Sequence, residues 1–239
     1  MYKCISFDFD RTIAYVTPLS HHIIPELLNE KGFAVTIDEF KKISEDLHSS
    51  PPEDMLDRYN RYGTMPTAER TRFNKEYNIA RIKALNLPGP EKETDVIFRK
   101  VVEEAYSKQK KVLYDDVKST ILKLTQMGRQ LYILSGNHSD GITEILAENQ
   151  LLEYFEEIIT VDKFSEIKEE NFQVLLDHSK LSQKEIVHIG DDVFCDGLGA
   201  KKFNIDSIII RRKSQLVYDN EQEDQFPVIT NLSELFKYI

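Results

Sequence analysis

The sequence is poor in several residue types that mark particular classes of protein. Among its 239 residues there is no tryptophan, and Cys4 and Cys195 are the only cysteines. With so few cysteines, and no spacing that suggests a zinc site, we expect a reduced, cytoplasmic protein. No apolar run approaches the roughly 20 residues that cross a bilayer, so we expect no membrane partner. Because the predicted first strand begins near Tyr2, we also expect no secretory signal peptide.

Positive charge is also scarce. The chain has 31 Lys and Arg residues against 41 Asp and Glu residues, which gives a formal net charge of −10. Such a chain has no global basic field, and we expect no nucleic-acid partner. An acidic protein that binds phosphate must therefore use local positive charge or a metal ion. The length suits one large domain or two modest domains.

Between residues 17 and 112, strand-like apolar runs disappear and apolar residues recur at helical spacing. We predict helices over 20–31, from 37 to 47 or 48, over 67–85 and over 94–108. Thr36 and Glu39 form the sequence pattern of a capping box at the second of these helices. Pro51-Pro52 marks a break after it. This segment of roughly a hundred residues is long enough to form a small domain of its own.

The rest of the chain alternates between short apolar runs and amphipathic segments. The first run is Ile5-Ser6-Phe7, and we predict further strands at residues 130–134, 157–161, 186–189, 208–210 and 228–230. Strands that alternate with helices indicate a parallel sheet covered on both faces. We therefore predict an α/β fold with a doubly wound, Rossmann-like core of residues 1–16 and 113–239. Residues 17–112 are predicted to form an inserted all-helical domain.

Polar side chains follow three of the predicted strands directly. Asp8 and Asp10 follow the first strand, Ser135 follows the strand at 130–134, and Asp191 and Asp192 follow the strand at 186–189. Parallel strands would bring all of these side chains to one edge of the sheet, where ligands bind in open α/β folds. An isolated Asp-x-Asp is a weak signal because Asp often caps turns. Three strand ends with such residues are hard to attribute to coincidence.

In this arrangement the chain resembles the haloacid dehalogenase superfamily of phosphohydrolases. The family's first motif, Asp-x-Asp-x-Thr after a strand, matches the segment from Asp8 to Thr12. Its second motif, Ser or Thr after a strand, matches Ser135. Its fourth motif matches Gly190-Asp191-Asp192 with the further Asp196. The insert after the first motif resembles the family's helical cap of type C1.

Two positions depart from the family pattern. Arg11 stands where many members have Gly, at a position that varies within the family. The third motif is a Lys, often followed by Pro, ahead of a helix, and no Lys-Pro occurs here. We predict that Lys168 takes this role because Phe172 follows it at helical spacing, and Lys163 is the alternative.

The strand-end residues suit phosphoryl transfer. Asp8 needs no base to become a nucleophile, because a carboxyl with a reference pKa near 3.9 is ionised at pH 7. We expect Asp10, crowded by Asp8 and Asp191, to protonate more easily and to serve as acid and then base. Clustered carboxylates call for a hard divalent cation with oxygen ligands, and we expect Mg²⁺.

The family resemblance assigns further roles. It implies that Asp8, the backbone carbonyl of Asp10 and Asp191 bind the metal, with Asp192 or Asp196 acting directly or through water. Lys168, the Ser135 hydroxyl and the backbone N–H of Gly136 or Asn137 would hold the phosphate oxygens. We interpret His138 as a loop residue and the pair His21-His22 as solvated.

These features predict a Mg²⁺-dependent phosphatase acting on a small phosphorylated metabolite through an aspartyl phosphate. Asp10 argues against a dehalogenase, which needs no acid at that position. A sugar phosphomutase of the same superfamily and a non-enzymatic phospho-accepting switch domain remain alternatives. We expect a monomer or homodimer whose helical insert closes as a lid over the site, with hinges near residues 14–18 and 111–115.

Overall fold

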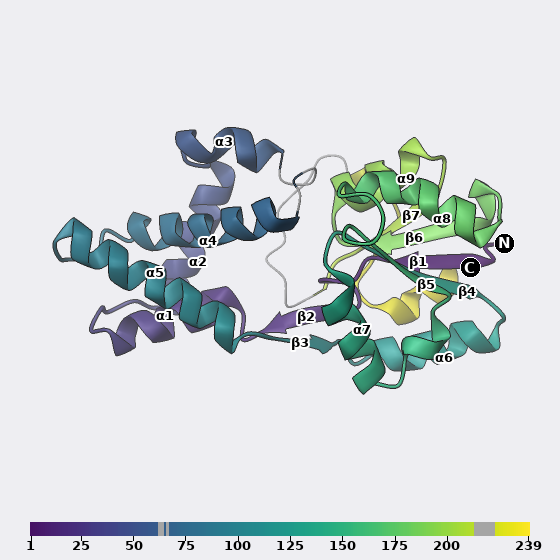
Figure 1. Cartoon of the computed structure of the whole chain (residues 1–239), viewed down its shortest axis with the longest axis horizontal. Helices are drawn as coiled ribbons and strands as arrows, with labels where there is room; N and C mark the ends of the chain where they lie inside the picture. The colour runs from purple at the N-terminus through teal and green to yellow at the C-terminus, as the bar shows by residue number, and fades with distance from the viewer. Residues whose placement is uncertain (62–64, 66, 213–222) are drawn as a thin grey trace. The chain divides into compact units, whose positions relative to one another are not determined.

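The structure is a computed structural model that describes residues 1–61, 65, 67–212 and 223–239 (Figure 1). It divides into two compact units. One consists of Met1–Tyr15 together with Lys111–Ile239, and the other is Val16–Lys110. None of the helices in these described ranges is long and apolar enough to cross a membrane.

The first unit, called the core unit below, is built on one six-stranded sheet. Its strands are β1 (Cys4–Phe7), β4 (Gln130–Ser135), β5 (Glu157–Thr160), β6 (Ile186–Gly190), β7 (Asp206–Ile210) and β8 (Val228–Ile229). They lie in the order β5-β4-β1-β6-β7-β8, and each neighbouring pair is parallel. The predicted α/β fold with a parallel sheet is therefore confirmed, and β1 lies inside the sheet as a buried strand.

Helices cover both faces of this sheet (Figure 1). α6 (Val117–Gln126) and α7 (Ser139–Glu148) lie on one face, and α8 (Asn171–Ser179) and α9 (Gly199–Lys202) lie on the other. Because side chains alternate along a strand, β1 contributes to two apolar clusters. Phe7 packs in the cluster that contains Ile121 of α6, whereas Cys4 packs in the cluster that contains Phe172 of α8.

The second unit, called the helical insert below, contains α1 (Ser20–Glu30), α2 (Ile37–Ser49), α3 (Glu53–Asn60), α4 (Thr67–Ala84) and α5 (Glu91–Lys108). The predicted capping box at α2 is confirmed, because Thr36 Oγ1 accepts from Glu39 N–H at 3.2 Å. Its apolar cluster joins α1 and α5 through side chains such as Leu27 and Val101.

Two helix starts in the insert differ from the prediction, and both involve proline. No helix was predicted directly after Pro51-Pro52, and α5 was predicted to begin at Thr94. Instead, Pro52 and Pro90 occupy the N-cap positions of α3 and α5. Proline lacks an N–H, which costs nothing at a helix start, and its fixed φ suits the entry into a helix. These prolines therefore begin helices rather than interrupting them.

The chain passes between the two units along two short strands. β2 (Ala14–Thr17) and β3 (Lys110–Leu113) pair in a two-stranded sheet. We expected two short hinges near residues 14–18 and 111–115, and these strands occupy much of both segments. The strand character of the second segment is masked in the sequence by Lys110 and Lys111, which precede its two apolar residues.

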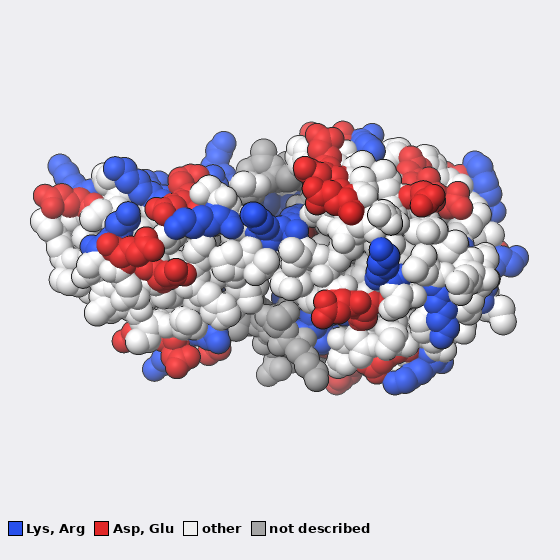
Figure 2. Space-filling view, turned by 90° about the horizontal axis from the view of Figure 1, so that it is seen from below, with Lys and Arg blue, Asp and Glu red and all other residues white. Residues whose placement is uncertain are grey.

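The distribution of charged side chains on the surface agrees with the excess of acidic over basic residues in the sequence. On the face drawn in Figure 2, basic and acidic side chains of the described residues are interspersed, and no continuous basic surface is visible there.

Candidate active site

The carboxyl ends of β4, β1 and β6 lie side by side in the core unit. Phe7 is in register with Ile133 on one side and with Ile189 on the other. The residue that follows β1, Asp8, donates its backbone N–H to the Ile189 carbonyl at 2.8 Å. The structure thus brings Ser135, Asp8 and Asp191 to one edge of the sheet, from three adjacent strands.

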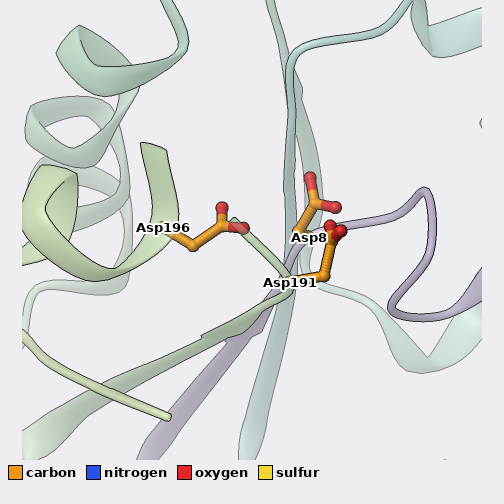
Figure 3. A group of neighbouring side chains, drawn as sticks. All are labelled: Asp8, Asp191 and Asp196. Carbon is orange, nitrogen blue, oxygen red and sulfur yellow. The ribbon is translucent and has the colours of Figure 1, made fainter. Parts of the chain in front are cut away.

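Three buried carboxylates meet at this edge. Asp8, Asp191 and Asp196 offer ligand oxygens that all lie within 4.8 Å of one another. Figure 3 shows the side chains of Asp8 and Asp191 close together, with Asp196 approaching from a neighbouring helical turn. Such a set of oxygen donors with like charge fits a hard divalent cation.

Burial and mutual repulsion oppose ionisation of two of these acids. Burial raises the pKa of Asp8 well above its ordinary value, and Asp196 and Asp191 raise it further, although Lys168 acts in the opposite direction. Burial also raises the pKa of Asp191 to about 7, against the lowering effect of Arg11. A cation bound between these groups would favour their ionised forms.

Lys168 lies between two of the carboxylates. Its Nζ is 2.5 Å from Asp8 Oδ1 and 2.5 Å from Asp196 Oδ1, and its side chain is only 7% exposed. Burial alone would lower the pKa of Lys168, but the charges of Asp196 and Asp8 outweigh it and raise that pKa. Lys168 begins a short 3₁₀ turn, Lys168–Glu170, directly before α8. Lys163, the alternative considered for the third motif, is exposed.

Asp196 is anchored by donors on both of its carboxylate oxygens. Oδ1 accepts from Lys168 and from His188 Nε2, the latter at 3.1 Å, and Oδ2 accepts from the Asp192 N–H at 2.9 Å. Although burial acts to raise the pKa of Asp196, the Lys168 charge and the His188 hydrogen bond lower it overall. The carboxylate packs against Gly190, where an added Cβ would lie 2.1 Å from Asp196 Cγ. Glycine is therefore required at the end of β6.

Asp192, one of the two acids expected to support the metal, lies outside the carboxylate group. Its side chain is exposed at the start of the turn Val193–Leu198, where Oδ1 accepts the N–H groups of Phe194 and Cys195 at 2.8 Å each. Of the two acids considered for supporting a metal, Asp196 is the one that joins Asp8 and Asp191.

The Asp10 side chain also lies outside the carboxylate group. We expected Asp8 and Asp191 to crowd it, but its described contacts are a cation and an amide. Lys111 Nζ lies 2.7 Å from Asp10 Oδ1, and Asn137 Nδ2 donates to Oδ2. The Asp10 side chain is 27% exposed, so it remains accessible to solvent.

The end of β4 and the loop that follows it carry the second set of expected site residues. Ser135 and Gly136 are buried, and Ser135 Oγ accepts the Asn137 N–H at 3.2 Å. His138 is exposed, in keeping with its interpretation as a loop residue.

Several residues of the site were not identified from the sequence. Arg11 Nε lies 3.1 Å from Asp191 Oδ2, and Lys111 contacts Asp10. His188 was also missed, although a histidine in the apolar run of β6 is an available signal. Since the Asp196 carboxylate accepts only, His188 Nε2 carries the proton and Nδ1 accepts the Ser6 hydroxyl at 2.7 Å. Burial lowers the pKa of His188, which agrees with this neutral tautomer.

Together, the fold and the site define an α/β protein with a buried acidic centre at the carboxyl ends of its inner strands. A family profile described as haloacid dehalogenase-like hydrolase matches residues 5–210, and the chain belongs to this family.

Curated relatives match only in part. The chain is 36% identical over 81 residues to a phosphoglycolate phosphatase of Aliivibrio fischeri, covering 33% of this chain and 36% of that protein. It is 25% identical over 126 residues to enolase-phosphatase E1 of Anopheles gambiae, covering 52% of this chain and 42% of that protein. The matched segments thus span well under half the length of each relative.

Solved structures share the fold over the whole chain. A dehalogenase structure superposes with a TM-score of 0.64 at 16% identity, covering 100% of this chain and 97% of the other. The putative HAD-hydrolase YfnB from Bacillus subtilis, bound to magnesium, superposes with a TM-score of 0.60 at 19% identity, covering 99% and 97%. At these identities the likeness concerns the fold alone.

Proposed function

We propose that this protein is a Mg²⁺-dependent phosphatase that hydrolyses phosphate monoesters of small metabolites through an aspartyl phosphate on Asp8. The observation that carries the proposal is the setting of Asp8. It follows an inner strand, contacts the buried Lys168 at 2.5 Å, and offers an oxygen within 4.8 Å of those of Asp191 and Asp196. The phosphatase names of both curated relatives support the reaction class.

Asp8, Asp191 and the backbone carbonyl of Asp10 would hold the metal, with Asp196 beside them. When bound, the cation supplies positive charge that reduces the repulsion between these carboxylates and an anionic phosphate. Lys168 contributes the same kind of charge from this chain. It favours the ionised form of Asp8 against the effect of burial.

In the first step, a carboxylate oxygen of Asp8 attacks phosphorus while the bond to the leaving oxygen breaks. Asp10 gives its proton to that leaving oxygen. In the second step, Asp10 takes a proton from water, whose oxygen attacks phosphorus and releases inorganic phosphate and free Asp8. The contacts of Asp10 with Lys111 and Asn137 are both donations to its carboxylate. At least one of these two donors must therefore move away before Asp10 can hold a proton and give it to the leaving oxygen.

The remaining phosphate oxygens would be held by the Ser135 hydroxyl, the backbone N–H of Gly136 or Asn137, and Lys168. Fixed donors in a closed site are commonly the largest contribution to stabilising charge in the transition state. In this proposal, residues 1–16 and 113–239 form the catalytic core, and residues 17–112 form a helical cap that carries substrate choice.

The test is hydrolysis of p-nitrophenyl phosphate by the purified protein with Mg²⁺, with EDTA as the metal-free control. We expect continuous phosphate release that Asp8→Asn abolishes without changing the circular dichroism spectrum. Activity that persists in Asp8→Asn would remove Asp8 as the nucleophile. One stoichiometric labelling event without turnover would favour a switch domain, and an isomeric product from a sugar monophosphate would favour a mutase.

A further inference from the structure

Arg11 combines an unusual backbone conformation with a contact at the acidic centre. Its φ is +62°, in the left-handed region, and its N–H donates to the Ala14 carbonyl at 2.6 Å in the turn after β1. Its Nε lies 3.1 Å from Asp191 Oδ2. The Arg11 side chain is 50% exposed, whereas the Asp191 side chain is 9% exposed.

The left-handed conformation is unfavourable for a residue with a Cβ and is adopted most easily by Gly, then by Asn or Asp. Local backbone preference therefore does not account for arginine at this position. The feature that arginine adds is a guanidinium group against one carboxylate of the buried group.

The positively charged side chains of the site contact different carboxylates. Lys168 lies between Asp8 and Asp196, each at 2.5 Å. Arg11 lies against the third member of the group, Asp191. Every carboxylate of the group thus has a positive side chain of this chain beside it.

A divalent cation that binds Asp191 must approach the same carboxylate as the Arg11 guanidinium. The two positive charges repel each other, and Asp191 Oδ2 cannot serve both fully at once. Because Arg11 is half exposed on a flexible side chain, it can move into solvent when a cation binds.

We propose that Arg11 is a counter-cation built into the metal centre, which neutralises Asp191 in the metal-free protein and is displaced when a divalent cation binds. This inference rests on the proposed function in one respect, the role of Asp191 as a metal ligand. It follows that Arg11 stabilises the metal-free site and weakens its affinity for the cation.

The experiment measures Mg²⁺ binding by isothermal titration calorimetry after EDTA treatment and desalting, with no substrate present. Arg11→Gln removes the charge and keeps a side chain with the same backbone preference. Arg11→Asn removes the charge and tolerates the left-handed conformation, and Arg11→Lys keeps the charge. We expect both neutral variants to bind Mg²⁺ about fivefold more tightly, the upper end of what an exposed ion pair contributes, and Arg11→Lys to stay close to wild type.

Arg99→Gln is the matched control, because it removes the same charge from an exposed pair with Asp95 in α5. Its Mg²⁺ affinity should equal that of wild type. A second readout is the melting temperature. Arg11→Gln should lower it in EDTA, because Asp191 loses its counter-cation, and saturating Mg²⁺ should remove the difference.

The outcomes separate this inference from the proposed function. Wild-type affinity in both neutral variants would overturn the role of Arg11 and leave the metal centre intact. Tighter binding in Arg11→Asn but not in Arg11→Gln would also overturn it, since backbone strain would then be the cause. If the wild-type protein binds no Mg²⁺, the metal centre of the proposed function fails, and this inference fails with it.

Discussion

Replacing Lys168 by alanine tests the organisation of the site most directly. The substitution leaves Asp8 and Asp196, whose side chains are 9% and 0% exposed, without the amine that lies between them. Removing one partner of a buried ion pair costs about 3–5 kcal/mol, because the other charge stays buried and uncompensated. For a chain of this length, 1 kcal/mol corresponds to roughly 2–4 °C. We therefore expect the melting temperature of the core unit to fall by about 6–20 °C in EDTA.

Saturating Mg²⁺ should restore part of this loss, since a bound divalent cation again places positive charge beside Asp8. The phosphatase activity of Lys168→Ala should not recover when Mg²⁺ restores this stability. The loss of a charged donor to the transition state is expected to lower kcat by about 10²–10³-fold.

The assays are thermal melting by circular dichroism, with and without Mg²⁺, and hydrolysis of p-nitrophenyl phosphate. Lys163→Ala is the control, because Lys163 is exposed and should change neither measurement appreciably. Lys168→Met adds a variant that keeps most of the aliphatic stem and loses the charge. A melting temperature close to wild type in Lys168→Ala, or a larger loss of activity in Lys163→Ala, would refute the assignment of Lys168.

Two further substitutions probe the anchoring of Asp196. Gly190→Ala places a Cβ 2.1 Å from Asp196 Cγ, so it should displace the carboxylate, abolish turnover and destabilise the fold by about 1–3 kcal/mol; a fully active variant would contradict the packing. His188→Ala removes the donor at 3.1 Å from Asp196 Oδ1 and should lower the free energy of unfolding in urea by about 1–3 kcal/mol, with reduced kcat. Unchanged stability and rate would show that this hydrogen bond is dispensable.

Much of the sheet edge could be predicted because it depends on local patterns. A short apolar run followed by Asp8, and a second run followed by Asp191, indicate strand ends without knowledge of the partner strands. The parallel arrangement then follows from the alternation of strands with helices. The capping box of Thr36 and Glu39 is likewise complete within four residues.

Contacts between segments that lie far apart in the sequence could not be predicted from such local patterns. Lys111 is 101 residues from Asp10 in sequence, and no local pattern indicates that they meet. The choice between Asp192 and Asp196 depended on one turn, in which the first acid caps backbone N–H groups and the second points back over Gly190. α3 was not predicted, and α5 was expected to begin at Thr94 rather than at Glu91, because proline both ends and begins helices.

The two buried acids Asp191 and Asp196 should respond in opposite ways to replacement by asparagine. Burial raises the pKa of Asp191 to about 7 and lowers its tendency to ionise, whereas the pKa of Asp196 is lowered because donors outweigh burial. A group with a lowered pKa contributes stability through its ionised form, and that contribution disappears when the charge is removed. A group with a raised pKa resists ionisation, so a neutral isostere fits its environment.

Hydrogen-bond geometry leads to the same expectation for Asp196→Asn. The Asp196 oxygens face donors on both sides, with Lys168 and His188 at Oδ1 and the Asp192 N–H at Oδ2. An amide has one oxygen, so its NH₂ group must face a donor in either orientation. We expect Asp196→Asn to lower the melting temperature in EDTA and Asp191→Asn to leave it unchanged or raise it, while both variants lose turnover. Equal destabilisation by the two variants would show that Asp196 is not the anchor of the site.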